Sequence, residues 1–134
     1  MADPDIAAIK TKLATVSGLS ASTVILGDPA RLEGLGSGPY CWIIGLSEKA
    51  KPSPVYGPVR QETDLLISLQ LGARTESAML TLRQNLFAAL INWQISPSYS
   101  PMQHRQGDFV FGDPAWFLWM DQYWTDYQRT TQGY

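Results

Sequence analysis

The segment Ala115–Thr130 constrains the fold more than any other part of the chain, because its large side chains fall into two alternating sets. Successive side chains of a strand point to opposite faces, so this period of two predicts one long strand. One face would carry Trp116, Leu118, Met120, Gln122, Trp124 and Asp126, and the other Phe117, Trp119, Asp121, Tyr123, Thr125 and Tyr127. Both faces are rich in aromatic residues. A helix can cover one of them, and we expect self-association to cover the other, since monomers rarely expose large apolar patches.

Two segments have the spacing of amphipathic helices. The first starts near Asp3, which can cap it, and ends at Ser17-Gly18; its apolar positions are Ile6, Ile9, Leu13 and Val16. The second is predicted over Thr75–Trp93, with Thr75 as N-cap and with Ile95-Ser96-Pro97 as its stop. Its apolar stripe consists of Met79, Leu82, Leu86, Leu90 and Trp93. The width of this stripe indicates a helix packed across a sheet.

Four further segments are predicted as strands. They are a short piece at Thr23–Ile25, then Pro39–Leu46, Arg60–Ala73 and Met102–Phe111. In the second of these, we expect one face to carry Tyr40, Trp42, Ile44 and Leu46. The order of elements predicts an α+β fold, with a mainly antiparallel sheet and two helices packed on one face.

Residues 1–134 are predicted to form a single domain, because no linker or repeat interrupts them. Segment 47–59 contains Pro52, Pro54 and Pro58 and is predicted to be an arm that projects from the body. Residues 129–134 are predicted to be a polar tail. The loop around Gly34, Gly36 and Gly38 lacks the Lys-Ser/Thr pair of a phosphate-binding loop.

Composition excludes several classes of protein. Ten basic residues against twelve acidic ones leave a net charge of −2, which argues against a protein that coats nucleic acid. One cysteine and one histidine supply neither a disulfide nor a structural zinc site, so we expect no metal and no cofactor. The first residues include Asp3 and Asp5 where a signal peptide would carry basic residues. We therefore expect a protein made in the cytoplasm and not inserted into a membrane.

The residues that could support catalysis have simpler interpretations. His104 reads as part of a solvated strand end, and Cys41 as a small buried hydrophobe whose pKa burial raises. Carboxylate pairs could form a glycosidase-type site, but nothing in the sequence brings two of them into one cleft. The candidates were Asp108 with Asp113 and Asp121 with Asp126. We expect no enzyme activity.

The order of motifs resembles the bacteriophage tail terminator (tail completion) family over nearly the whole chain. After a short helix come the strand Pro39–Leu46, the proline-containing arm and Arg60-Gln61-Glu62 at the start of a strand. A helix then ends with Leu82–Trp93 before a proline, a strand surrounds Gly107-Asp108-Phe109, and the aromatic segment Trp116–Arg129 closes the pattern.

The resemblance implies a structural virion protein that forms a ring, usually of six copies. Such a ring caps the tail tube, ends its polymerisation and offers a docking face to the head–tail connector, while DNA passes through without specific binding. It implies assembly in the host cytoplasm and a final place in the virion tail. The candidate assembly interface comprises Lys49, Lys51, Pro52, Pro54, Tyr56, Trp116, Trp119, Tyr123, Trp124 and Tyr127.

Two alternatives remain open at this point. One is a small-molecule-binding or enzymatic α+β cone in which Asp108, Asp121 or His104 acts in a pocket lined by the aromatic strand. The other is a carbohydrate-binding module that uses Trp116 and Trp119, since flat rings stack on sugars. An enclosed cavity with converging polar groups would favour the first alternative.

Overall fold

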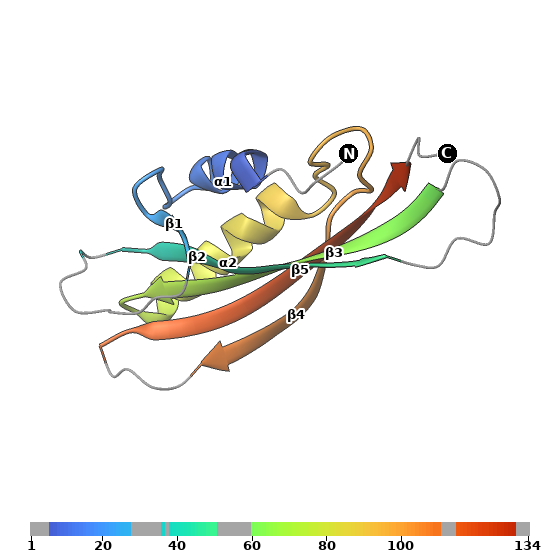
Figure 1. Cartoon of the computed structure of the whole chain (residues 1–134). Coiled ribbons are helices and arrows are strands. Elements are labelled where there is room, and N and C mark those ends of the chain that lie inside the picture. The colour runs from blue at the N-terminus through green and yellow to red at the C-terminus, as the bar shows by residue number, and fades with distance from the viewer. Residues whose placement is uncertain (1–5, 28–35, 37, 51–59, 111–114, 131–134) are drawn as a thin grey trace.

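The computed structural model describes residues 6–27, 36, 38–50, 60–110 and 115–130. It contains two helices and five strands, in the order α1 (Ile6–Ala14), β1 (Val24–Leu26), β2 (Tyr40–Ala50), β3 (Arg60–Ala73), α2 (Glu76–Leu90), β4 (Gln103–Val110) and β5 (Phe117–Thr130). Figure 1 shows the long, twisted strands of one sheet with the helices beside it.

The five strands form a single sheet in the order β1-β2-β3-β5-β4. β1 pairs with β2 in parallel, and every other pair is antiparallel. The longest pairing joins β3 to β5, from Arg60 opposite Thr130 to Ala73 opposite Phe117, without a shift in register. The α+β class and the mainly antiparallel sheet predicted from the sequence are confirmed.

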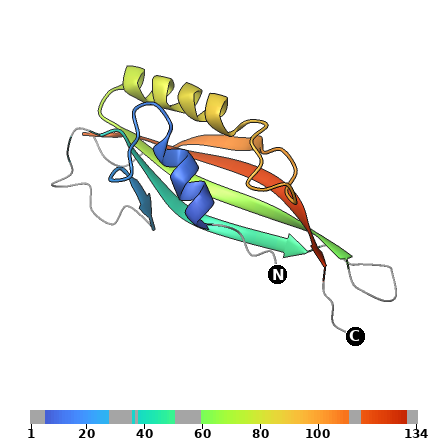
Figure 2. The same ribbon diagram turned by 90° about the horizontal axis from the view of Figure 1, so that it is seen from above.

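The core lies between the helices and the sheet face that carries the odd-numbered residues of β3 and β5. The buried residues of both helices belong to the same apolar cluster as those of this sheet face. Figure 2, seen from above, shows α1 and α2 over the sheet. The fully buried side chains with the largest volumes include Tyr123, Tyr127, Ile67, Leu69 and Leu86.

Helix α2 begins as the sequence predicts and ends earlier. Thr75 is the N-cap, and its hydroxyl accepts a 3.1 Å hydrogen bond from the backbone N–H of Ala78. The prediction that the helix runs to Trp93 is wrong, because Ile91 is extended and Asn92 has a φ of 66°. Asparagine tolerates this left-handed conformation better than most residues. The backbone N–H of Asn92 then donates to the carbonyl of Met102, at 2.9 Å.

A β-bulge in β2 changes which residues face the core. The register of β2 against β3 shifts between Ile43 and Gly45, and an extra residue in one strand reverses the faces beyond it. Leu46 therefore packs against the core cluster, as Cys41 and Ile43 do. The prediction that Leu46 shares a strand face with Trp42 is wrong.

Strand β2 also runs further than the sequence predicts. It continues to Ala50, so the first part of the expected arm 47–59 is a strand paired with β3. β5 ends at Thr130, where the predicted strand ends, so the assignment of Arg129 and Thr130 to the polar tail is wrong. The rest of the arm and tail lies outside the described residues, as do Asp3 and the expected turn at 112–114.

Candidate assembly surfaces

Three of the aromatic residues predicted to lie at an interface are buried within the chain. Tyr123 is 0% exposed, Tyr127 is 2% exposed and Trp116 is 5% exposed. The hydroxyl of Tyr127 donates to the carboxylate of Glu48, which ties β5 to β2. These rings stabilise the fold. Of the other predicted residues, Lys49 is exposed, and Trp119 and Trp124 are partly exposed. Lys51, Pro52, Pro54 and Tyr56 lie outside the described residues.

Trp116 belongs to a compact aromatic cluster at one end of the sheet. The guanidinium of Arg74 lies 3.9 Å from the centroid of the Trp116 ring, and the Tyr40 ring lies 5.8 Å from it. Tyr40 also stacks on Trp42, which is 2% exposed. Gly72 permits this packing, since a Cβ there would lie 2.9 Å from Cζ3 of Trp42. The cluster accounts for the burial of Trp116, which the sequence assigned to a partner interface.

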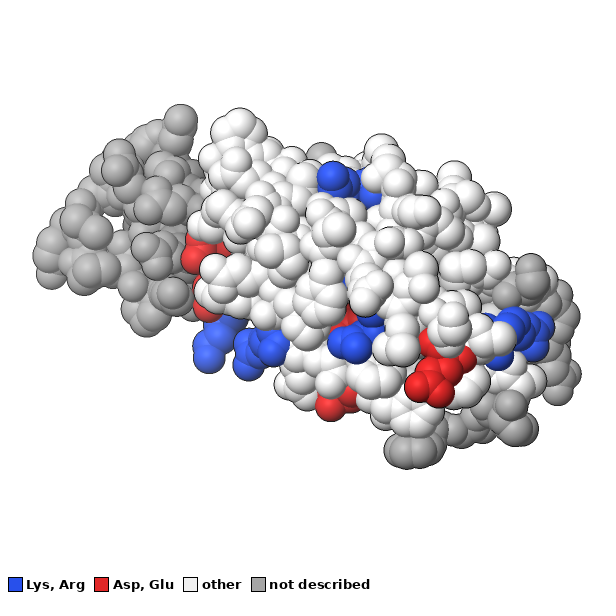
Figure 3. Space-filling view, turned by 180° about the vertical axis from the view of Figure 1, so that it is seen from behind, with Lys and Arg blue, Asp and Glu red and all other residues white. Residues whose placement is uncertain are grey.

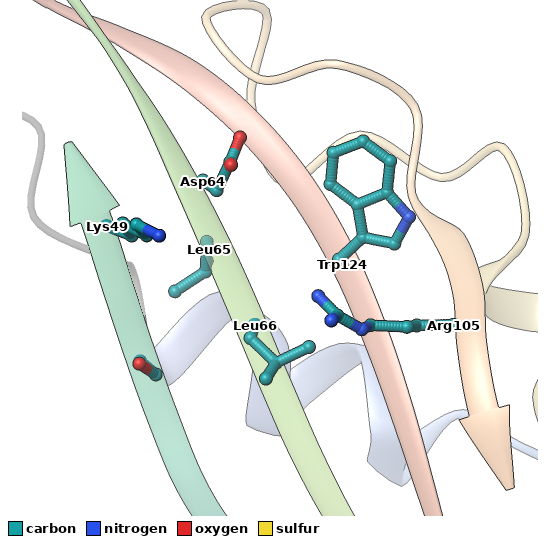
Figure 4. Close-up of a pocket in the computed structure, with 7 residues that line it drawn as sticks. Lys49, Asp64, Leu65, Leu66, Arg105 and Trp124 are labelled. Carbon is teal, nitrogen blue, oxygen red and sulfur yellow. The ribbon is translucent and has the colours of Figure 1, made fainter. Parts of the chain in front are cut away.

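A basic groove lies at the opposite end of the same sheet face. It has a volume of about 310 Å³ and is lined by Ser47, Lys49, Asp64, Leu65, Leu66, Arg105 and Trp124. In Figure 4 the side chains of Lys49 and Arg105 point toward the middle of the groove from its two sides. Leu66 lies opposite Trp124 in the pairing of β3 with β5, and both are partly exposed.

A second surface, the acidic-apolar patch, surrounds the start of α2 and the end of β4. It consists of Glu76, Leu80 and Phe109, all of which are exposed. Leu80 is 48% exposed and Phe109 is 39% exposed. Between α2 and the strands is a hollow of about 350 Å³, lined by Glu76, Met79, Leu80, Phe109, Phe117 and Trp119. Figure 3 shows, on the face seen from behind, charged side chains gathered mainly along the lower border of a largely uncharged surface.

A buried charge cluster joins α2, β4 and β5. Asp121 is 0% exposed and accepts two 2.9 Å hydrogen bonds from Arg83, one from Nε and one from Nη2. Nε2 of His104 lies 2.9 Å from Oδ1 of the same carboxylate, and this nitrogen is the donor because a carboxylate only accepts. His104 is thus partly buried, and its assignment to a solvated strand end is wrong.

The electrostatics of this cluster favour a structural role. The hydrogen bond to Asp121 raises the pKa of Arg83, and burial raises the pKa of Tyr123, with the Asp121 charge adding to the effect. Arg83 also packs over the ring of Trp119, 4.2 Å from its centroid. Asp108 faces away from this cluster, since it lies opposite Met120 in the pairing of β4 with β5. In the described part of the chain, no three His, Cys, Asp or Glu residues are arranged to hold a metal ion.

The sequence contains a signal for this cluster that the predictions above do not use. Arg83 lies one helical turn beyond Met79, at the border of the apolar stripe of α2. Asp121 lies on the same face of β5 as the buried Tyr123. A cation beside the core face of a helix and a carboxylate on the core face of a strand indicate a buried pair, because an unpaired charge there would be costly.

Cys41 offers a direct test of core burial. It is fully buried, and desolvation raises its pKa to about 12. The thiolate is the reactive form, so at pH 8 the folded chain should react with an aromatic disulfide reagent about a thousandfold more slowly than the unfolded chain. Absorbance of the released thiolate measures the rate, and the same protein in 6 M guanidinium chloride is the control. Equal rates in both solvents would contradict the buried position.

A comparison with models of known protein families identifies the family of this chain. A family model described as phage tail terminator protein matches residues 39–133, which is more than half of the chain. The chain belongs to the phage tail terminator family. The matched region contains β2 to β5 and α2, and it therefore includes both the basic groove and the acidic-apolar patch. No curated protein matches the chain.

Membership in the phage tail terminator family indicates a structural component of a phage tail that contacts other phage proteins. This agrees with the resemblance inferred from the order of motifs. Neither helix in the described part of the chain is long and apolar enough to cross a bilayer.

Proposed function

We propose that this protein forms a ring, of six copies by the resemblance stated above, that caps the tail tube, ends its polymerisation and offers a docking face to the head–tail connector. The match to the tail terminator family over residues 39–133 is the observation that supports this function. The ring assembles in the host cytoplasm and remains in the virion tail. DNA passes through it without specific binding, in keeping with the net charge of −2.

The two surfaces described above support assembly into a ring. They lie on different parts of the subunit, so a contact between them is heterologous. A heterologous contact generates a closed ring when a whole number of identical rotations from one copy to the next adds up to a full turn. The segment 47–59 adds to this interface by contacting a neighbouring copy or the tube.

The ring and its capping activity can be tested together. Native mass spectrometry of the purified chain, alone and with the tube protein of the same phage, should show a ring-sized oligomer. Added while tube protein polymerises, the chain should stop elongation, and electron microscopy would then show shorter tubes with a ring at one end. An unrelated α+β protein of similar size is the control. A chain that stays monomeric with tube protein and leaves tube length unchanged would contradict this function.

A further inference from the structure

We propose that copies of this chain join edge to edge, with β4 of one copy pairing antiparallel with the part of β2 that extends beyond β1 in the next copy. The inference rests on the proposed ring and names the strands that connect its subunits. It assigns a second copy as the partner because the two edges of one sheet match in strand direction, backbone orientation and apolar side chains.

The sheet has an open edge on each side. β1 pairs with β2 only from Cys41 to Ile43, so residues 44–50 of β2 have no described strand beyond them. On the other side, β4 pairs with β5 and with no other described strand. Figure 1 shows β4 along one border of the sheet. Open edges can pair with another chain, and a closed ring of edge-to-edge contacts would leave neither edge exposed.

The direction of the strands permits this pairing. β2, β3, β5 and β4 alternate in direction across the sheet, so β4 runs opposite to β2. A rotation about an axis roughly along the strands keeps their direction, so β2 of the next copy continues the alternation beside β4. Each strand also has a regular stretch after its shift in register, residues 45–50 in β2 and residues 106–110 in β4.

The backbone groups point outward at matching positions of the two edges. The carbonyl of Ile43 accepts a 2.9 Å hydrogen bond from Gly27, directly after β1, so the backbone of Ile43 faces away from β3. Backbone groups alternate between the two sides along a strand, and paired residues of an antiparallel ladder face toward or away from each other together. The registers carry this alternation to Leu46, which faces away from β3, and to Gly107 and Phe109, which face away from β5.

Side chains select one register for the pair. Leu46 packs against the core cluster, and Phe109 lies opposite Trp119, so both are on the helix-facing side of the sheet. With Phe109 opposite Leu46, Ser47 lies opposite Asp108 on the other side. An aromatic ring beside an aliphatic side chain is a favourable cross-strand pair. Lys49 is then diagonal to Asp108, and its long side chain can reach that carboxylate.

Exposed hydrophobic side chains lie at both edges. Leu26 is 56% exposed and lines, together with Leu46, a shallow hollow of about 240 Å³ where β1 ends. At the other edge, Phe109 is 39% exposed and shares a hollow with Leu80 of α2. The register above brings the ring of Phe109 to the hollow beside Leu26. A shift by two residues would instead place the ring opposite the carboxylate of Glu48, which is exposed.

Disulfide trapping tests this register. Ser47→Cys with Asp108→Cys places two thiols opposite each other, where the Cα atoms of a non-hydrogen-bonded pair lie about 4.5 Å apart, within the range of a disulfide. With tube protein and a mild oxidant, the double variant should form covalent multimers up to the size of the ring on a non-reducing gel. Cys41 is 0% exposed and should not react.

The matched control is Ser47→Cys with Gln103→Cys. Gln103 is also an exposed residue of β4, but it lies about 15 Å from Asp108 along the strand, so this variant should stay monomeric on the same gel. Each single cysteine variant should stay monomeric too, because a heterologous contact never brings two identical edges together. The three replaced side chains are exposed, so circular dichroism should show folded variants.

The outcomes separate this pairing from the proposed function. If the wild-type chain forms rings with tube protein but the Ser47 and Asp108 cysteines do not cross-link, the pairing is overturned and the capping function stands. Cross-linked dimers of a single variant would also overturn the pairing, since they show two identical edges in contact. A wild-type chain that forms no ring with tube protein would overturn both.

Discussion

Replacement of Arg83 with alanine is expected to lower the free energy of unfolding by about 3–5 kcal/mol. The change removes both hydrogen bonds that the guanidinium donates to Asp121 and leaves a fully buried carboxylate that still accepts a hydrogen bond from His104. The cost of desolvating that charge is then no longer offset. Urea unfolding followed by tryptophan fluorescence measures the effect.

Arg105→Ala is the matched control, because Arg105 is an exposed arginine on the neighbouring strand β4. Its removal should change the free energy of unfolding by no more than about 1 kcal/mol. Arg83→Lys should fall between the two, since a lysine keeps the charge but cannot form the paired hydrogen bonds. If Arg83→Ala proved as mild as Arg105→Ala, the cluster would not stabilise the fold.

Leu86→Ala is expected to destabilise the protein by about 2–5 kcal/mol. Leu86 is 0% exposed and lies in the middle of the α2 stripe, against the sheet. Truncation removes buried methyl groups and leaves a cavity that the surrounding strands can fill only in part. Thermal and urea unfolding at low protein concentration, where subunits do not associate, measure the change.

Leu80→Ala serves as the control on the same helix. Leu80 is 48% exposed, so the same chemical change should cost less than about 0.5 kcal/mol in the monomer. The Leu80 variant should instead weaken ring formation, because this residue belongs to the acidic-apolar patch. Equal losses of stability for both leucines would contradict the orientation of α2.

The parts of the fold that depend on local periodicity were predictable. The alternation in Arg60–Ala73 and Ala115–Thr130 matches β3 and β5 closely, and Thr75 marks the start of α2. These signals are strong because one face of each element is largely buried where the structure describes its side chains, which forces the apolar residues into register with the backbone.

The features that were missed depend on contacts between distant segments. The bulge after Ile43 is a property of how β2 pairs with β3, and no local pattern marks it. The end of α2 depends on Asn92, whose backbone bonds to Met102. The sequence alone could not show whether Tyr123 and Tyr127 are buried in the core or exposed at an interface, because both environments favour aromatic residues.

The central position of β5 has a consequence for how the protein is made. β5 is the last described strand to leave the ribosome, yet it lies between β3 and β4, and β4 pairs with no other described strand. Trp124, which forms one wall of the basic groove, also comes from β5. A nascent chain therefore lacks a complete sheet and a complete groove until synthesis has passed this strand.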